Sequence, residues 1–134
     1  MQTPPDAFVA RLSASSLGMA DMLTMYIGDR LQLYAALQHG GPLTSTELAA
    51  RANIHERYAR EWLEQQAVSG VLDVVDPSAP ADQRRYALPA AHAEVLLDRD
   101  SLNYTAPSAR WRRRRRAHRS PPAAPATRAR SVRG

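Results

Sequence analysis

The 134-residue sequence contains no cysteine and no lysine. Without thiols, the chain has no disulfide bridge, thiolate zinc site or cysteine nucleophile. No stretch approaches the roughly 18 apolar residues of a membrane-spanning helix. The N-terminus also lacks the basic start and apolar run of a secretory signal. We therefore expect a cytoplasmic protein with no membrane span.

Groupings of residues that would support catalysis or metal binding are also missing. His39, His55, His92 and His118 have no ligand-like spacing to one another or to a carboxylate, so we predict no metal site. The serines lie outside any nucleophile-elbow pattern, so hydroxyl catalysis is not supported either. We predict no catalytic residue in this chain.

Basic residues are concentrated at one end of the sequence. Residues 1–109 carry eight arginines and all thirteen acidic residues, a net charge of −5, whereas residues 110–134 carry ten arginines and no acid. Residues 108–134 contain almost no large apolar side chain, so we predict a disordered Arg/Pro/Ala-rich tail. The run Arg112–Arg116 would bind nucleic acid only non-specifically, by attraction to phosphate. The tail is either a functional basic arm or the product of a reading-frame shift.

The remaining sequence is predicted to be helical in its first half. Residues 1–15 are polar and contain proline, so we expect a flexible N-terminus. From Ser16 to about Gln38 apolar residues recur every three or four positions, which predicts one long helix. Thr44 with Glu47 forms a capping-box pattern at the start of a second helix, and a third is expected from His55 to about Ser69. The pair Tyr58 and Trp62 is expected in the core.

The second half predicts a β-hairpin and a short helix. Residues 71–75 and 84–88 alternate as strands do and flank a Pro-rich loop, and Pro89 can open a helix through about Leu97. The order of helices and strands is that of a winged helix-turn-helix. We therefore predict a mostly α fold with a small β-hairpin and a long N-terminal helix, spanning residues 16–107.

The first long helix has more apolar residues than one contact face can bury. Further apolar residues lie away from the expected core stripe, which runs through Leu17, Ala20, Leu23, Ile27, Leu31 and Tyr34. Such a helix requires a second partner, either another copy of the chain or a separate domain. The residues expected at that dimer or domain interface are Met22, Met25, Tyr26 and Leu33.

Four ordered segments carry a family resemblance: residues 27–34, 41–49, 55–63 and 85–89. From about Leu17 to Pro107 the sequence resembles the N-terminal winged-helix domain of bacterial class I S-adenosylmethionine-dependent methyltransferases. One departure is Gln32, where the family pattern has glycine; on an exposed helix face this change is expected to cost little. The resemblance implies a domain for dimerisation and for covering the substrate pocket, with methyl transfer in a Rossmann-like domain that follows.

The sequence departs from the family where the catalytic domain would begin. S-adenosylmethionine is the cofactor of the family, and a Rossmann-like site needs a Gly-rich turn that lets the backbone approach the ligand. None of the six glycines forms a Gly-x-Gly pair, so no cofactor site is expected in this chain. We expect a truncated, inactive winged-helix domain that acts as a homodimer or with a separate catalytic domain.

A DNA-binding transcriptional regulator is the alternative function. The second helix of a helix-turn-helix motif enters the major groove, and arginines neutralise the DNA phosphates. The residues available for this are Arg57, Arg60, Arg84 and Arg85. Three glutamates on the same helix favour intrahelical pairs instead, Arg57 with Glu61 and Arg60 with Glu64.

Overall fold

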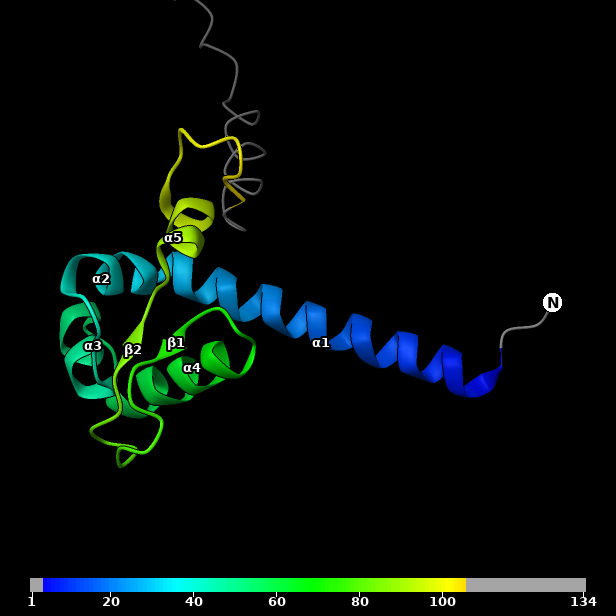
Figure 1. The fold of residues 1–134 in the computed structure, drawn as a ribbon, viewed down its shortest axis with the longest axis horizontal. Helices are drawn as coiled ribbons and strands as arrows, with labels where there is room; N and C mark the ends of the chain where they lie inside the picture. The colour runs from blue at the N-terminus through cyan, green and yellow to red at the C-terminus, as the bar shows by residue number, and fades with distance from the viewer. Residues whose placement is uncertain (1–3, 106–134) are drawn as a thin grey trace, which may run out of the picture.

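The computed structural model describes residues 4–105. Figure 1 shows one long helix extending from a body that the other elements form. The mostly α fold with a small hairpin is confirmed; the predicted tail over residues 108–134 lies outside the described residues. In chain order the elements are α1 (Pro5–Arg30), α2 (Leu33–Gly40), α3 (Ser45–Ala52), α4 (Glu56–Val68), β1 (Asp73–Val74), β2 (Tyr86–Ala87) and α5 (Ala90–Leu97).

The N-terminal helix starts earlier and ends earlier than the sequence predicts. It begins at Pro5, a residue whose fixed φ suits the first turn, so the flexible segment expected over residues 1–15 is helical from there on. The helix expected to continue to Gln38 breaks after Arg30. Gln32 adopts a left-handed conformation with φ of 58°, and α2 starts at the next residue. Gln32 therefore does not lie on an uninterrupted helix face, which corrects the expectation for this position.

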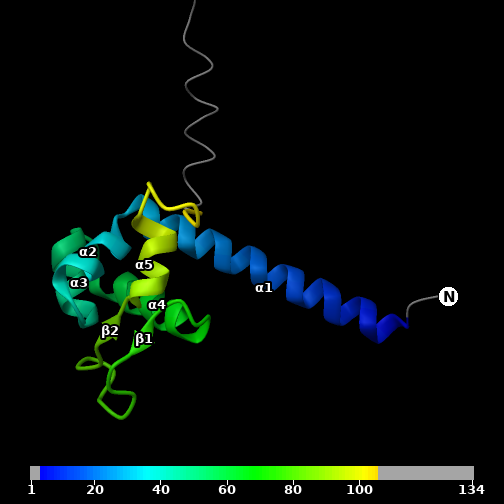
Figure 2. The same ribbon diagram turned by 45° about the horizontal axis from the view of Figure 1, so that its top comes forward.

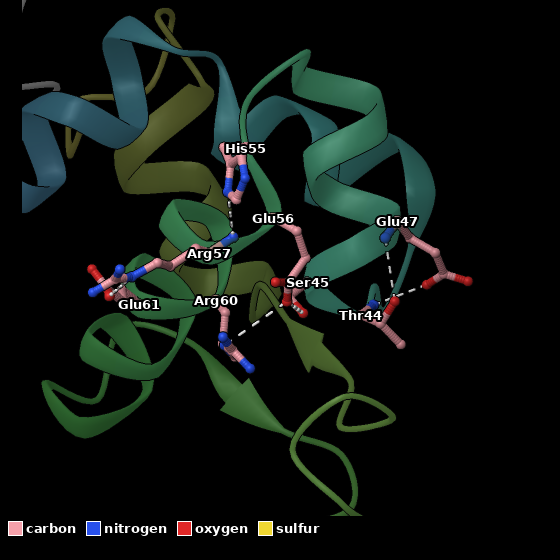
Figure 3. A network of polar contacts seen from close by, with 8 residues as sticks. All are labelled: Thr44, Ser45, Glu47, His55, Glu56, Arg57, Arg60 and Glu61. Carbon is pink, nitrogen blue, oxygen red and sulfur yellow. Dashed lines mark hydrogen bonds and ion pairs between the residues drawn. The ribbon is translucent and has the colours of Figure 1, made fainter.

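Helices α3 and α4 form the helix-turn-helix motif, and local hydrogen bonds fix its ends. The Thr44 hydroxyl accepts from the Glu47 amide at 3.3 Å, and the Glu47 carboxylate accepts from the Thr44 amide at 2.9 Å, which confirms the capping box. Asn53 is left-handed in the turn that follows. The His55 ring accepts from the Arg57 amide at the start of α4 (Figure 3).

The wing is a short antiparallel pair in which Asp73 faces Ala87 and Val74 faces Tyr86. Leu43, just before α3, adds a bridge on the other side of Tyr86 through two backbone hydrogen bonds of 2.9 and 3.0 Å. This bridge ties the wing to the helix-turn-helix motif. Both predicted strands are present, although they are shorter than expected.

The core lies between α2, α3, α4 and the wing. Trp62 is buried as predicted, whereas Tyr58 is 66 % exposed, because α4 turns a different face inward. Tyr58 packs edge-on against the His55 ring instead. Within residues 4–105, no helix is both long and apolar enough to cross a membrane. The large fully buried apolar side chains are Tyr34, Tyr86, Leu33, Leu37, Leu48 and Leu63.

Candidate functional site

Helix α1 carries most of the large apolar side chains that this part of the chain leaves exposed. Residues 4–20 are exposed throughout, because the N-terminal half of α1 projects away from the body (Figures 1 and 2). At 3.6 residues per turn, six of these side chains fall along one side of the helix. We call this set the α1 stripe: Phe8, Leu12, Met19, Met22, Leu23 and Tyr26.

Where α1 contacts the body, the side of the helix opposite the stripe is small or polar. Gly28 lies so close to α4 and α2 that an added Cβ would be 2.5 Å from the Trp62 ring and 2.6 Å from the Tyr34 ring. The Trp62 indole donates to the Thr24 carbonyl at 2.9 Å. This close, hydrogen-bonded contact determines which side of α1 remains free.

A buried polar network holds the same contact in place. The Tyr34 hydroxyl donates to the Gln66 side chain, whose amide donates to the Thr24 hydroxyl at 3.0 Å. Burial, with a further contribution from Asp29, raises the pKa of the Tyr34 phenol, so it stays protonated and keeps donating. Asp21 accepts from Ser69 at 2.6 Å and from Gln65 at 3.0 Å. Because these partners are polar, the apolar pattern of the sequence did not reveal this face.

The predicted interface residues fall into different environments. Met22 and Tyr26 lie in the α1 stripe, and Met25 is half-buried against the core. Leu33 is 0 % exposed, because the helix break before α2 directs it into the core. The prediction that Leu33 lies at an interface is therefore wrong.

The predicted core stripe is corrected as well. Tyr34 is buried as predicted, whereas Leu17, Ala20, Leu23, Ile27 and Leu31 are exposed. Phe8 and Leu12 were not among the residues predicted to lie outside the core, and Leu23 was predicted inside it. The signal that finds them is helical spacing. Phe8 and Leu12 are four residues apart, Leu12 and Met19 are seven apart, and Leu23 lies four residues after Met19 and three before Tyr26.

Two hollows flank the C-terminal half of α1. An apolar groove of about 230 Å³ lies between α1 and α5, with Met22, Met25, Val71 and Val95 among its walls. A more polar hollow of about 310 Å³ lies on the α2 side and has Asp29 and Arg99 in its lining. Thr105 and Tyr104, the last described residues, line the groove and the hollow respectively. The chain therefore leaves the described region beside both of them.

The arginines considered for DNA binding are engaged within the chain. Arg57 pairs with Glu61 at 2.9 Å, as predicted, and Arg85 pairs with Glu47 at 2.9 Å. Arg60 pairs with Glu56 at 3.8 Å, not with the expected Glu64. Figure 3 shows the α4 pairs side by side on one helix. Three of the four guanidinium groups therefore already have a carboxylate partner.

The fourth arginine, Arg84, donates to the Ala79 carbonyl at 3.3 Å inside the wing. Arg84 has no carboxylate partner among residues 4–105, and its Nε is buried without a hydrogen bond. Among residues 4–105, no group of three or more His, Asp or Glu side chains could hold a metal ion.

The three-helix core, the helix-turn-helix motif and the hairpin place the chain in the class of winged helix-turn-helix domains. Residues 19–99 match the Rv2258c-like winged HTH domain, and the chain belongs to this family. No curated protein matches the sequence.

Solved structures of low sequence identity share the fold. Human N-acetylserotonin methyltransferase in complex with SAM matches at a TM-score of 0.58 and 17 % identity, over 75 % of this chain and 28 % of that one. PigF with SAH matches at 0.57 and 20 % identity, over 87 % and 33 %. The S-adenosylmethionine-dependent methyltransferase SibL, in its apo form, matches at 0.53 and 21 % identity, over 81 % and 33 %. The chain thus spans a third or less of the length of these proteins.

Proposed function

We propose that this chain is the N-terminal winged-helix domain of an S-adenosylmethionine-dependent methyltransferase, which forms homodimers and helps to cover a substrate pocket. Its family membership and its likeness to one part of three longer structures, two of them named as methyltransferases, support the assignment. The sequence lacks a Gly-rich turn for the methyl donor, so the domain has no methyl-transfer activity by itself.

The α1 stripe is the observation on which the dimer proposal depends. Large apolar side chains grouped on one face of a helix mark an interaction surface, since water solvates such a patch poorly. The other face of α1 is already occupied by Trp62 and Tyr34, so the stripe is free for a second chain.

A pair of matched variants on α1 tests the dimer. Leu12→Glu places a charge in the stripe, whereas Leu17→Glu places the same charge on another side of the same helix; both side chains are at least half exposed, at 50 % and 68 %. Sedimentation at tens of micromolar is expected to give a dimer for the parent chain and for Leu17→Glu, and a monomer for Leu12→Glu. A parent chain that sediments as a monomer would refute the dimer.

The proposed covering role involves the two hollows beside residues 104 and 105. In a longer protein the following domain would start next to them, and Asp29 and Arg99 would then face it. Methyl transfer is proposed to take place in another domain, and calorimetry of this chain with S-adenosylmethionine tests that. We expect no heat of specific binding to this chain, and saturable binding would contradict the proposal.

DNA binding remains the competing function, and the pairings of Arg57, Arg60 and Arg85 weigh against it. The described residues also carry a net charge of −5, which repels phosphate. A gel shift at about 150 mM salt separates the two functions, since specific complexes survive at that ionic strength. A chain ending at Ala109 that still bound one DNA sequence tightly would favour the regulator.

A further inference from the structure

We infer that two copies of this chain pair through α1 in an antiparallel orientation, with Phe8 and Leu12 of one copy against Tyr26 and Met22 of the partner subunit. This inference rests on the homodimer proposed above and specifies its geometry. It concerns the relative direction and the register of the two helices, which the fold of a single chain does not determine.

The spacing of the stripe suits the packing of two helices along their length. The steps between positions 8, 12, 15, 19, 22 and 26 alternate between four and three residues, which is the repeat of a two-stranded coiled coil. We call these six positions the seam. Five of the six are large and apolar, the sixth is Ser15, and none is charged. The close contacts of the body with α1 lie on the other side, at Thr24 and Gly28, and leave these positions exposed; α5 flanks them at Met22.

The six positions form a self-complementary set. Each of the pairs 8 with 26, 12 with 22 and 15 with 19 is centred on residue 17, so a two-fold axis there matches each of these six positions with another one. Leu23 of the α1 stripe lies beside them and is not part of this set. Each large side chain near one end of the helix then meets a large one of the partner. Ser15 meets Met19 of the partner subunit near the axis, where the neighbouring Ser16 is also small.

The position of the body favours the antiparallel orientation over the parallel one. The body lies against the C-terminal end of α1, whereas the N-terminal half projects away from it (Figures 1 and 2). In a parallel pair both bodies would crowd the same end, and Ser15 would face its own copy and leave the middle of the seam poorly filled. In the antiparallel pair the projecting half of one α1 covers Met22 of the partner subunit, which lines the apolar groove beside α5.

Cysteine cross-linking distinguishes the two orientations, and the absence of natural cysteines gives a clean background. Full-length Leu12→Cys and Met22→Cys chains, one of them carrying a longer tag, are oxidised alone and as a mixture. In the antiparallel register the two Leu12 positions lie about 15 Å apart along the axis, ten residues at 1.5 Å each. A disulfide needs Cα atoms within about 7 Å. We expect the mixture to form a mixed dimer at least tenfold faster than either chain forms its own.

A second pair of cysteine variants and a control position that faces away from the seam complete the experiment. Phe8→Cys mixed with Tyr26→Cys is expected to behave in the same way, and Leu17→Cys alone is expected to remain unlinked. Self-linking of Leu12→Cys as fast as the mixture would establish the parallel orientation and overturn the inference. A rapid Leu17→Cys link, which would indicate random collision, also overturns it.

Sedimentation of the same reduced samples separates this inference from the proposed function. A dimer in which neither pair cross-links refutes the register and leaves the homodimer standing. A monomer refutes both.

Discussion

Gly28 lies where α1 packs tightly against the body, on the side of the helix that the hydrophobic periodicity did not identify. A methyl group there would lie 2.5 Å from the Trp62 ring and 2.6 Å from the Tyr34 ring, and both rings are held by other contacts. Glycine is required at this position because of packing, since its backbone conformation is helical.

Replacing Gly28 by alanine is therefore expected to destabilise the fold by about 1–3 kcal/mol, the usual cost of overpacking a core. Gly18→Ala is the matched control, because nothing lies within 4 Å of its added methyl group. There alanine is expected to add about 0.5–1 kcal/mol through helix propensity. Urea denaturation of both variants measures the difference, and equal effects at the two positions would contradict the close contact.

Gln32 is the residue that separates α1 from α2. Its φ of 58° lies in the left-handed region, which costs most non-glycine residues roughly 1–2 kcal/mol. Its side chain donates to the Asp29 carbonyl at 2.6 Å, which offsets part of this cost.

Gln32→Gly is expected to raise the free energy of unfolding by up to about 1 kcal/mol, because glycine adopts the left-handed conformation freely. Gln32→Asn is expected to fall between glutamine and glycine, since asparagine tolerates this region better than most residues. Thermal denaturation measures the series. A less stable glycine variant would mean that the hydrogen bond outweighs the backbone strain.

Among the elements, α3 is the one whose start could be read directly from the sequence. Thr44 and Glu47 are three residues apart, and the capping box they form needs nothing from the rest of the chain. The structure adds one partner from a distant element, because Arg85 of the wing pairs with Glu47. The Thr44 amide, and then Arg85, lower the pKa of the Glu47 carboxyl.

This lowered pKa predicts how pH acts on stability. The unfolded chain takes up a proton at a higher pH than the folded chain does, so the contribution of Glu47 is fully present above the ordinary glutamate pKa of about 4.3. It is lost as the pH falls through the lowered value. We expect the free energy of unfolding to decline less steeply below pH 5 in Glu47→Gln than in the parent chain. Parallel slopes would show that the pair contributes nothing measurable.

Helix α1 illustrates what the sequence could not supply. Its helical character followed from spacing, and part of the candidate interface, Met22 and Tyr26, was correctly named as lying outside the core. The contact face was wrong, because Asp21 and Thr24 bind polar partners on α4 that no hydrophobic pattern marks. Leu33 was wrongly predicted at the interface because the helix breaks at Gln32, where the sequence has no glycine or proline to indicate a break.

At the scale of the whole molecule, the fold is a compact body with one long projecting helix. The body has its own core, whereas the N-terminal half of α1 is exposed on all sides among residues 4–105. Single helices of this length are marginal in water, so most of their stability must come from packing. We therefore expect the helical structure of the projecting half to depend on packing against the second chain of the proposed homodimer.

That dependence predicts that stability varies with concentration. If folding and association are linked, the midpoint of thermal unfolding rises with protein concentration, because mass action favours the dimer. We expect the midpoint of the parent chain and of Leu17→Glu to increase over a hundredfold concentration range, and that of Leu12→Glu to stay constant. Far-ultraviolet circular dichroism at the lowest concentration should also show less helix in the parent chain, as the projecting half unwinds in the monomer. A constant midpoint together with constant helicity would mean that α1 is stable alone, and the stripe would then need a partner other than a second copy.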